Sequence, residues 1–340
     1  MCMRRSLIFF ACLVIVLPVA VFAGGQRERD PDAVIEIKVT TTDAPSTVWV
    51  QALRGAAERI AERTDGRVDV QLYPSGELMV YDEAIEAVMS NADIMYFTEP
   101  GTFGEYVPEY LTISAPYMFS SYEAYEEFAK TDTMKQINDR AASAGLRAIA
   151  PTFVLGHRSV LANKPVHTVQ DLQGLRLRVP GLRSFTDTFE ALGANYQAMP
   201  FNEVFSAIQT GVLDGLESSI GNAYNNVIYD AFRSTPYFSK NRHLMTLHGL
   251  FAGEQFWQSI PEEYRIIIEE EMAAAAYANN RDVVRADEEL LQKLVDEGVE
   301  IVYLNDLSSF QEAVQPLVRT YENYDQIAAE IAVVEERIGN

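Results

Sequence analysis

Arg178 is the residue whose type and position most clearly indicate chemistry in this chain. It belongs to the alternating run RLRV and stands two residues before Pro180, where a strand must end because proline has no amide hydrogen for the ladder. A guanidinium at such a strand end would face the mouth of a cleft, and its planar fork of donors can hold a carboxylate through two parallel hydrogen bonds. The strand-end pattern by itself favours a plain surface arginine.

The other reactive side chains do not fall into the spacings of known catalytic sites. The four histidines, which form no HExxH pair, are His157, His167, His243 and His248. No GxSxG elbow, P-loop or GxGxxG follows a candidate strand. Acid pairs carry little information in a chain with 49 aspartates and glutamates. We therefore expect no metal site, no cofactor and no catalytic residue.

The elements that would position Arg178 begin with an alternation of strand-like and helix-like patterns. Strands are predicted at 34–40, 68–73 and 92–98, with helices from about 46 and over 82–90. The first helix has one apolar face, made of Trp49, Leu53, Ala56 and Ile60. Two further helical stretches follow, separated near residues 131–133. This order predicts an α/β lobe.

A second lobe is predicted to contain Arg178. One strand at 146–154 would lead out of the first lobe and another at 158–163 would begin the second. A strand at 243–253 would return, and the chain would then be helical over 261–297 and 307–338. A chain that crosses back in this way predicts discontinuous lobes, with a hinge near residues 153–158 and 245–250.

The first 23 residues have the pattern of a secretory signal. Arg4 and Arg5 precede an apolar run that ends in Val21-Phe22-Ala23, so we expect cleavage after Ala23 and a flexible polar leader at 24–33. A membrane anchor is the alternative, but the run is short and proline interrupts it. A lipid anchor on Cys12 is not expected, because too few apolar residues precede that cysteine.

Composition limits the partners of the exported chain. Both cysteines, Cys2 and Cys12, lie within the expected signal, so no disulfide is predicted after cleavage. Cleavage would also remove two arginines and no acid, which takes the formal charge from −22 to −24. Nucleic acid and anionic membrane surfaces are poor partners for such a chain. Nearby arginines can still bind an anion, because distant charges are screened.

Three motifs follow one another between Leu172 and Ser219: GLRLRVP, GAN and MPFNEVFSAIQTGVLDGLES. They resemble the signature of the solute receptors of tripartite ATP-independent periplasmic (TRAP) transporters, the DctP-like family, whose pattern is GLK(I/L)RVP, GA and MPFSEVYTALQTGVVDGQEN. The match is long and free of gaps. The resemblance implies that Arg178 clamps the carboxylate of a ligand.

The resemblance also assigns roles to residues outside the RVP motif. Arg158, in GHRSVLANKP, matches the second arginine of the family, with a salt bridge between lobes as the alternative. Phe201 corresponds to an aromatic wall against the ligand, or it is a hydrophobic staple at a helix start. Glu99 matches a cleft glutamate that accepts from ligand hydroxyl or amino groups, with a capping or solvated role as the alternative.

Four further positions belong to the expected site. Ser218 occupies the place of the usual asparagine in DGQEN, and a serine reaches less far and has one donor instead of two. Ligand identity is therefore not transferable from relatives with asparagine. His248 lies near the place of a family glutamine, while Trp49 and Tyr81 stand at helix starts that face the same predicted cleft. A core or rim position is the alternative for these last three.

We interpret the chain as an α/β protein with the two-lobed fold of periplasmic solute-binding proteins, with discontinuous lobes and a long interlobe helix. Lobe I is expected over 34–155 and about 247–285, and lobe II over 156–246 and about 286–335. The chain would capture a small organic acid in the periplasm and deliver it to the small and large membrane subunits of a TRAP transporter. A sugar acid fits best, ahead of a small dicarboxylate or a compatible solute.

Two other functions stay open at this point. A secreted enzyme on a similar two-lobed scaffold could use a glutamate or aspartate as general base on a carboxylated substrate. A sensory or scaffold protein could have kept the fold and lost transport, because Ser218 departs from the signature.

Overall fold

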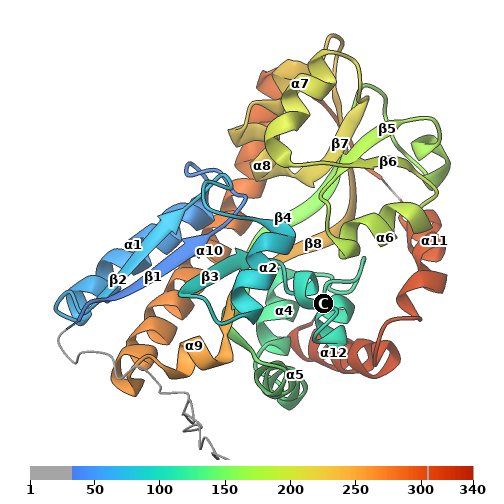
Figure 1. Ribbon diagram of the computed structural model, residues 1–340. Coiled ribbons are helices and arrows are strands. Elements are labelled where there is room, and N and C mark those ends of the chain that lie inside the picture. Colours follow the sequence, from blue (N-terminus) through green and yellow to red (C-terminus); the bar gives the residue numbers. More distant parts are fainter. Residues whose placement is uncertain (1–32, 305, 340) are drawn as a thin grey trace, which may run out of the picture. The chain divides into compact units, whose positions relative to one another are not determined.

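One mixed sheet organises the chain (Figure 1). The computed structural model describes residues 33–304 and 306–339, so the expected signal, its cysteines and nearly all of the expected leader lie outside the described residues. The order along the sheet is β2-β1-β3-β8-β4-β7-β5-β6, with β9 paired to β8. The strands are β1 (Ile35–Thr40), β2 (Val68–Tyr73), β3 (Ile94–Thr98), β4 (Leu146–Ala162), β5 (Arg176–Val179), β6 (Asn195–Ala198), β7 (Gly215–Ser219), β8 (Tyr237–Gly253) and β9 (Glu300–Val302).

Helices connect and cover these strands. They are α1 (Val48–Arg63), α2 (Tyr81–Met89), α3 (Pro108–Ile113), α4 (Tyr122–Phe128), α5 (Asp132–Ser143), α6 (Arg183–Ala191), α7 (Val204–Gln209), α8 (Ile220–Asn225), α9 (Glu254–Gln258), α10 (Glu262–Asp296), α11 (Ser308–Val318) and α12 (Tyr324–Ile338). Short 3₁₀ turns are η1 (Pro100–Phe103), η2 (Val169–Leu172), η3 (Phe201–Glu203) and η4 (Ile228–Ala231). Among the described residues, no helix combines the length and the apolar character that crossing a membrane requires.

Local sequence explains where several of these elements start, stop and face. The four apolar residues predicted for one face of the first helix are all buried on α1. Ser121 and Thr131 cap α4 and α5, because their hydroxyls accept from the amides of Ala124 and Met134. Strand β2 has the predicted bounds, and α10 starts and ends within one residue of the predicted 261–297.

Strands β4 and β8 connect the two halves of the sheet. Parallel pairs β1–β2 and β1–β3 lie on one side of them, and parallel pairs β5–β6 and β5–β7 lie on the other. The separate strands predicted at 146–154 and 158–163 are one strand of 17 residues, so this prediction was wrong. Gly156, at φ +98, and register shifts against β8 interrupt the alternation without ending the strand.

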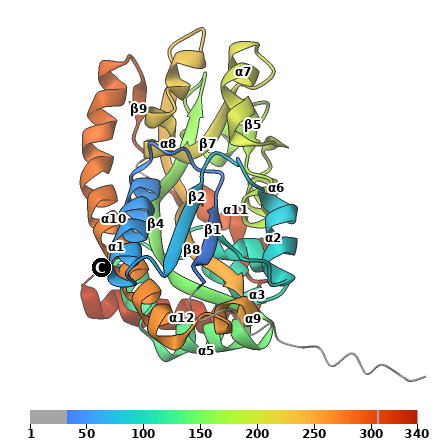
Figure 2. The ribbon, with the colours of Figure 1, turned by 60° about the vertical axis from the view of Figure 1, so that its left-hand side comes forward.

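Helix α10 runs alongside this connection, at the left in Figure 2, and packs against α1, β4 and α8. Two of its buried side chains bond to the backbone of β4 where the register shifts. The Asn280 Oδ1 accepts from the Val154 amide at 2.8 Å, and the Asn279 Nδ2 donates to the Val154 carbonyl at 2.8 Å. In the middle of β4, these side-chain amides therefore satisfy the backbone amide and carbonyl of Val154 in place of a neighbouring strand.

Candidate functional site

A cavity opens where the ends of β1 and β3 meet β5, β4 and α8. About 650 Å³ of empty space lies between its side chains, and this volume includes space open to solvent. Six of the eight residues predicted from the sequence line it, namely Tyr81, Glu99, Arg158, Arg178, Phe201 and His248. The other lining residues are Thr42, Asp43, Ala44, Tyr96, Thr98, Leu155, Pro180, Leu182, Phe185, Asn222, Asn226 and Thr246.

Arg178 reaches this cavity from the end of β5, and it is 2% exposed. Its Nε donates to the Met199 carbonyl at 2.9 Å, and its guanidinium carbon lies 5.3 Å from the centre of the Phe201 ring. Burial lowers the pKa of Arg178 to about 10; the charge of Glu217 opposes this shift, and the charge of Arg158 adds to it. No carboxylate in the described part of the chain forms an ion pair with Arg178. The site therefore holds a buried cation that no carboxylate of the described residues bonds directly.

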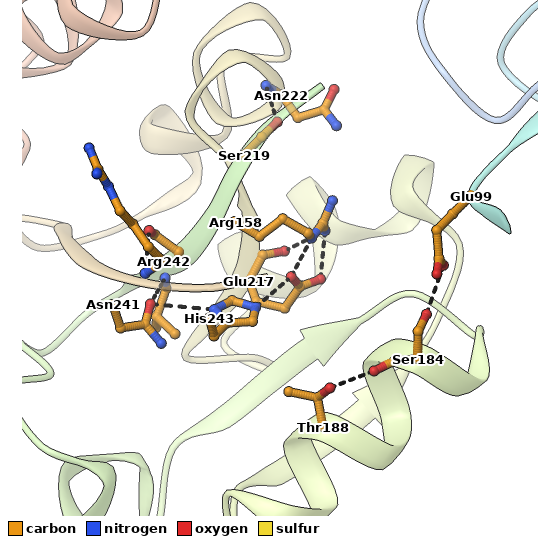
Figure 3. Close-up of polar contacts among 12 residues, drawn as sticks. Glu99, Arg158, Ser184, Thr188, Glu217, Ser219, Asn222, Asn241, Arg242 and His243 are labelled. Atoms are coloured by element: carbon orange, nitrogen blue, oxygen red, sulfur yellow. Dashed lines mark hydrogen bonds and ion pairs between the residues drawn. The ribbon is translucent and has the colours of Figure 1, made fainter. Parts of the chain in front are cut away.

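Arg158, on β4, is held by a carboxylate of the signature segment (Figure 3). Its Nε and Nη2 donate to the two carboxylate oxygens of Glu217 on β7, at 2.5 and 2.6 Å. His243 lies 3.2 Å from the same carboxylate. Burial alone would raise the pKa of Glu217, but the charge of Arg158 and the hydrogen bonds from His243 and Arg158 outweigh it and hold that pKa at about 2. Both partners belong to the expected lobe II, so this salt bridge does not cross between the expected lobes.

Glu99 follows β3 and is fully buried. Its Oε2 accepts from the hydroxyl of Ser184 on α6 at 2.7 Å, whereas its Oε1 has no hydrogen-bond partner among the described residues (Figure 3). Burial raises the pKa of Glu99 to about 7, although the hydroxyls of Ser184 and Ser114 act against the rise. A Cβ at Gly101 would lie 2.5 Å from Oε1, so a larger residue there would displace the Glu99 carboxylate.

Asp43 and His248 also line the cavity. Asp43 follows β1, and its Oδ2 accepts from the Thr41 hydroxyl at 2.8 Å. His248, on β8, places Nε2 at 3.9 Å from that same oxygen. The Nδ1 of His248 lies 2.7 Å from the Leu247 carbonyl, which only a protonated Nδ1 can satisfy.

Two predicted residues do not line the cavity. Ser218 is buried on β7, and its hydroxyl has no partner among the described residues. Trp49 is 2% exposed on α1 and belongs to the hydrophobic core, which is one of the two alternatives left open for it. Asn222 and Asn226, four residues apart after β7, bring amide groups into the cavity instead. Their i, i+4 spacing was the available signal for this pair.

The fold and the buried cationic cavity are those of a solute-binding protein. The chain belongs to the bacterial extracellular solute-binding protein family 7, whose model matches residues 39–324. The C4-dicarboxylate-binding periplasmic protein DctP of Rhodobacter capsulatus is 29% identical over 268 residues, which is 78% of each chain. The resemblance to TRAP solute receptors predicted from the signature segment is therefore confirmed.

Solved structures agree on the two-lobed fold. A TRAP periplasmic solute-binding protein from Fusobacterium, with bound sn-glycerol-3-phosphate, is 31% identical, with a TM-score of 0.84 and coverage of 90% of this chain and 99% of that one. Another from Chromohalobacter salexigens, with bound D-glucuronate, is 26% identical, with a TM-score of 0.79 and coverage of 88% and 99%. The predicted fold class is confirmed.

Proposed function

We propose that this chain is a periplasmic receptor that captures a small organic acid in the cavity around Arg178. The observation that carries the proposal is a buried guanidinium with no carboxylate partner among the described residues. A buried charge without a partner is costly, and an anionic ligand would supply the missing counter-ion. Arg158 would add a second positive charge beside the ligand, while Glu217 keeps it in place.

A hydroxylated acid of the sugar-acid class suits the rest of the cavity. Asn222, Asn226 and Thr246 bring amides and a hydroxyl to its wall, and Phe201 adds an aromatic face. Support comes from the relatives, since the Chromohalobacter protein holds a uronate and the Fusobacterium protein holds a phosphate ester of glycerol. Both ligands carry one anionic group and several hydroxyls.

Delivery to membrane partners is part of the proposal. The family is described as extracellular and the Rhodobacter relative as periplasmic, which supports export. Export through the expected signal, with cleavage after Ala23, is part of the proposal. The small and large membrane subunits of a TRAP transporter would receive the ligand. We propose lobes with the ranges given above and a hinge in β4 and β8, whose register shifts make them the weak points of the ladder.

The ligand would leave chemically unchanged. The rival proposal of a secreted enzyme needs turnover of a bound acid. Incubating the purified protein with each acid that binds, and following product by mass spectrometry, separates the two functions. Formation of product at a rate proportional to protein concentration would exclude a pure receptor.

The direct test uses Arg178→Ala with Arg176→Ala as its matched control, because both arginines lie on β5 but Arg176 is exposed and paired with Asp214. Small molecules released by denaturing the native protein are first identified by mass spectrometry. At 100 times its Kd, such a ligand stabilises the protein by about 2.7 kcal/mol. We expect Arg178→Ala to abolish this stabilisation and Arg176→Ala to keep it. Equal stabilisation of both variants would refute the clamp.

A further inference from the structure

Two chemically different pairs of residues line the cavity. Arg158 and Arg178 provide cationic donors, and no other lysine or arginine is among the described lining residues. Asp43 and His248 form the second pair, with the His248 Nε2 3.9 Å from the Asp43 Oδ2. A ligand that contacts both pairs must therefore offer acceptors to the arginines and donors to Asp43 and His248.

Asp43 is held in place with one carboxylate oxygen free of protein partners. Its side chain is 9% exposed, and Oδ2 accepts from the Thr41 hydroxyl. No described residue donates a hydrogen bond to Oδ1. The backbone of Asp43 is also fixed, because its carbonyl accepts from the Ser75 amide at 2.8 Å. The free oxygen is thus an acceptor with a defined position at the wall of the cavity.

His248 adds a second acceptor beside Asp43. Its Nδ1 proton donates to the Leu247 carbonyl, and burial lowers the pKa of the ring, so the neutral tautomer leaves a lone pair on Nε2. That nitrogen lies 3.9 Å from the Asp43 Oδ2. The Asp43 Oδ1 and the His248 Nε2 are therefore both acceptors, and a ligand beside them must supply hydrogen-bond donors.

The pKa of Tyr81 responds to the charges of both arginines and of Asp43, so these groups lie around one small space. Burial raises the pKa of Tyr81, the charges of Arg178 and Arg158 lower it, and the charge of Asp43 raises it. A single phenol therefore senses both arginines and the aspartate. The neutral hydroxyls of Tyr81 and Thr246 do not compensate the charge of a second anion near Asp43.

We propose that Asp43 restricts the ligand to acids with one anionic group and with hydroxyl donors beside Asp43 and His248, and that it excludes C4-dicarboxylates. The inference rests on the proposed function, since it assumes an anion at the arginines. A second carboxylate would meet the Asp43 carboxylate and the His248 lone pair with no donor to offer. Ligand hydroxyls would instead donate to both acceptors.

The test is a titration of the full exported chain by calorimetry with two sets of probes. One set is hydroxylated (D-gluconate, D-glucuronate, L-fuconate and sn-glycerol 3-phosphate), and the other is dicarboxylic (succinate, L-malate and fumarate). We expect at least one hydroxylated probe to bind at least tenfold more tightly than every dicarboxylate, since hydrogen bonds to charged groups change affinity by about 10- to 100-fold. Comparing the Kd values of the hydroxylated carboxylates with that of sn-glycerol 3-phosphate shows whether the arginines prefer a carboxylate or a phosphate.

Asp43→Asn tests whether Asp43 causes the preference. The asparagine keeps the shape and replaces one acceptor by a donor, so the ratio of dicarboxylate Kd to hydroxy-acid Kd should fall at least tenfold. Asp65→Asn, at an exposed turn, makes the same change in net charge and should leave the ratio unchanged. Unfolding without ligand checks that each variant is folded.

The outcomes separate this inference from the receptor proposal. A dicarboxylate that binds the wild type as tightly as the best hydroxy acid overturns the inference, whatever the variants do. An unchanged ratio in Asp43→Asn overturns the role of Asp43 even if the preference exists. Binding that survives Arg178→Ala, or no binding of any probe, counts against the receptor proposal itself and removes the basis of the inference.

Discussion

Replacing Glu217 by glutamine should destabilise the unliganded protein and make its stability depend more strongly on a bound anion. Glu217 is fully buried and neutralises Arg158 through two hydrogen bonds. Its pKa of about 2, against an ordinary value of 4.5, corresponds to about 3 kcal/mol in favour of the charged form. Loss of one partner from a buried pair costs about 3–5 kcal/mol, so the two magnitudes agree.

The assay is equilibrium unfolding in guanidinium chloride at pH 7, with and without a saturating acid ligand. We expect Glu217→Gln to lower the free energy of unfolding by about 3 kcal/mol without ligand. The ligand should recover part of that loss, because its anion then serves two unneutralised arginines, so it should stabilise the variant more than the wild type.

Glu254→Gln is the matched control for this prediction. Glu254 accepts from Arg147 on β4 through the same two-bond geometry, at 2.7 and 2.7 Å, but the side chains are 20% and 29% exposed. Water screens this pair, so its loss should cost about 1 kcal/mol or less. Equal losses in the two variants, or a ligand effect that is the same in Glu217→Gln and the wild type, would refute the reasoning.

Two further predictions concern a buried acid and a close backbone contact. The raised pKa of Glu99, about 7, means that the folded protein keeps a proton between about pH 4.5 and pH 7 that the unfolded chain releases. Stability should therefore fall by about 3 kcal/mol as pH rises through that window, and Glu99→Gln should remove this decline in urea unfolding at pH 5 and pH 8; parallel profiles would contradict it. Gly215→Ala would place a Cβ 2.2 Å from the Leu161 carbonyl oxygen and should cost about 3 kcal/mol in the same assay. Gly181→Ala meets open space and should be neutral, so a similar loss in both would show that the contact is not the cause.

Local pattern was sufficient for much of the fold. The bounds of β2 and the buried face of α1 follow from period-two and period-3.6 spacing over short windows. The long helix α10 was also predictable, because residues 261–297 contain many strong helix formers and neither glycine nor an interior proline. The continuity of strand β4 could not be predicted from local sequence. Proline and glycine usually mark turns, and only the pairing with β8 shows that the strand continues through Pro151 and Gly156.

The site depends on contacts that sequence spacing does not contain. Glu217 meets Arg158 because the β4–β7 register places Arg158 opposite Ser219, and these residues are far apart in the chain. Asp43 is one acid among 49, and only the turn after β1 brings it to the cavity. Ser218 was placed by motif alignment, and the side chain that reaches the cavity belongs to Asn222, one helical turn further along the chain.

The two asparagines of α10 couple this helix to the strand in which the hinge is proposed. Because Asn279 and Asn280 bond to both backbone groups of Val154, the middle of β4 is fastened to the helix as well as to β8. Any rotation of one half of the sheet against the other must therefore strain or shift α10. Under the proposed hinge, the outer face of this helix would change position with occupancy. A partner could thus distinguish loaded from empty protein without approaching the bound acid.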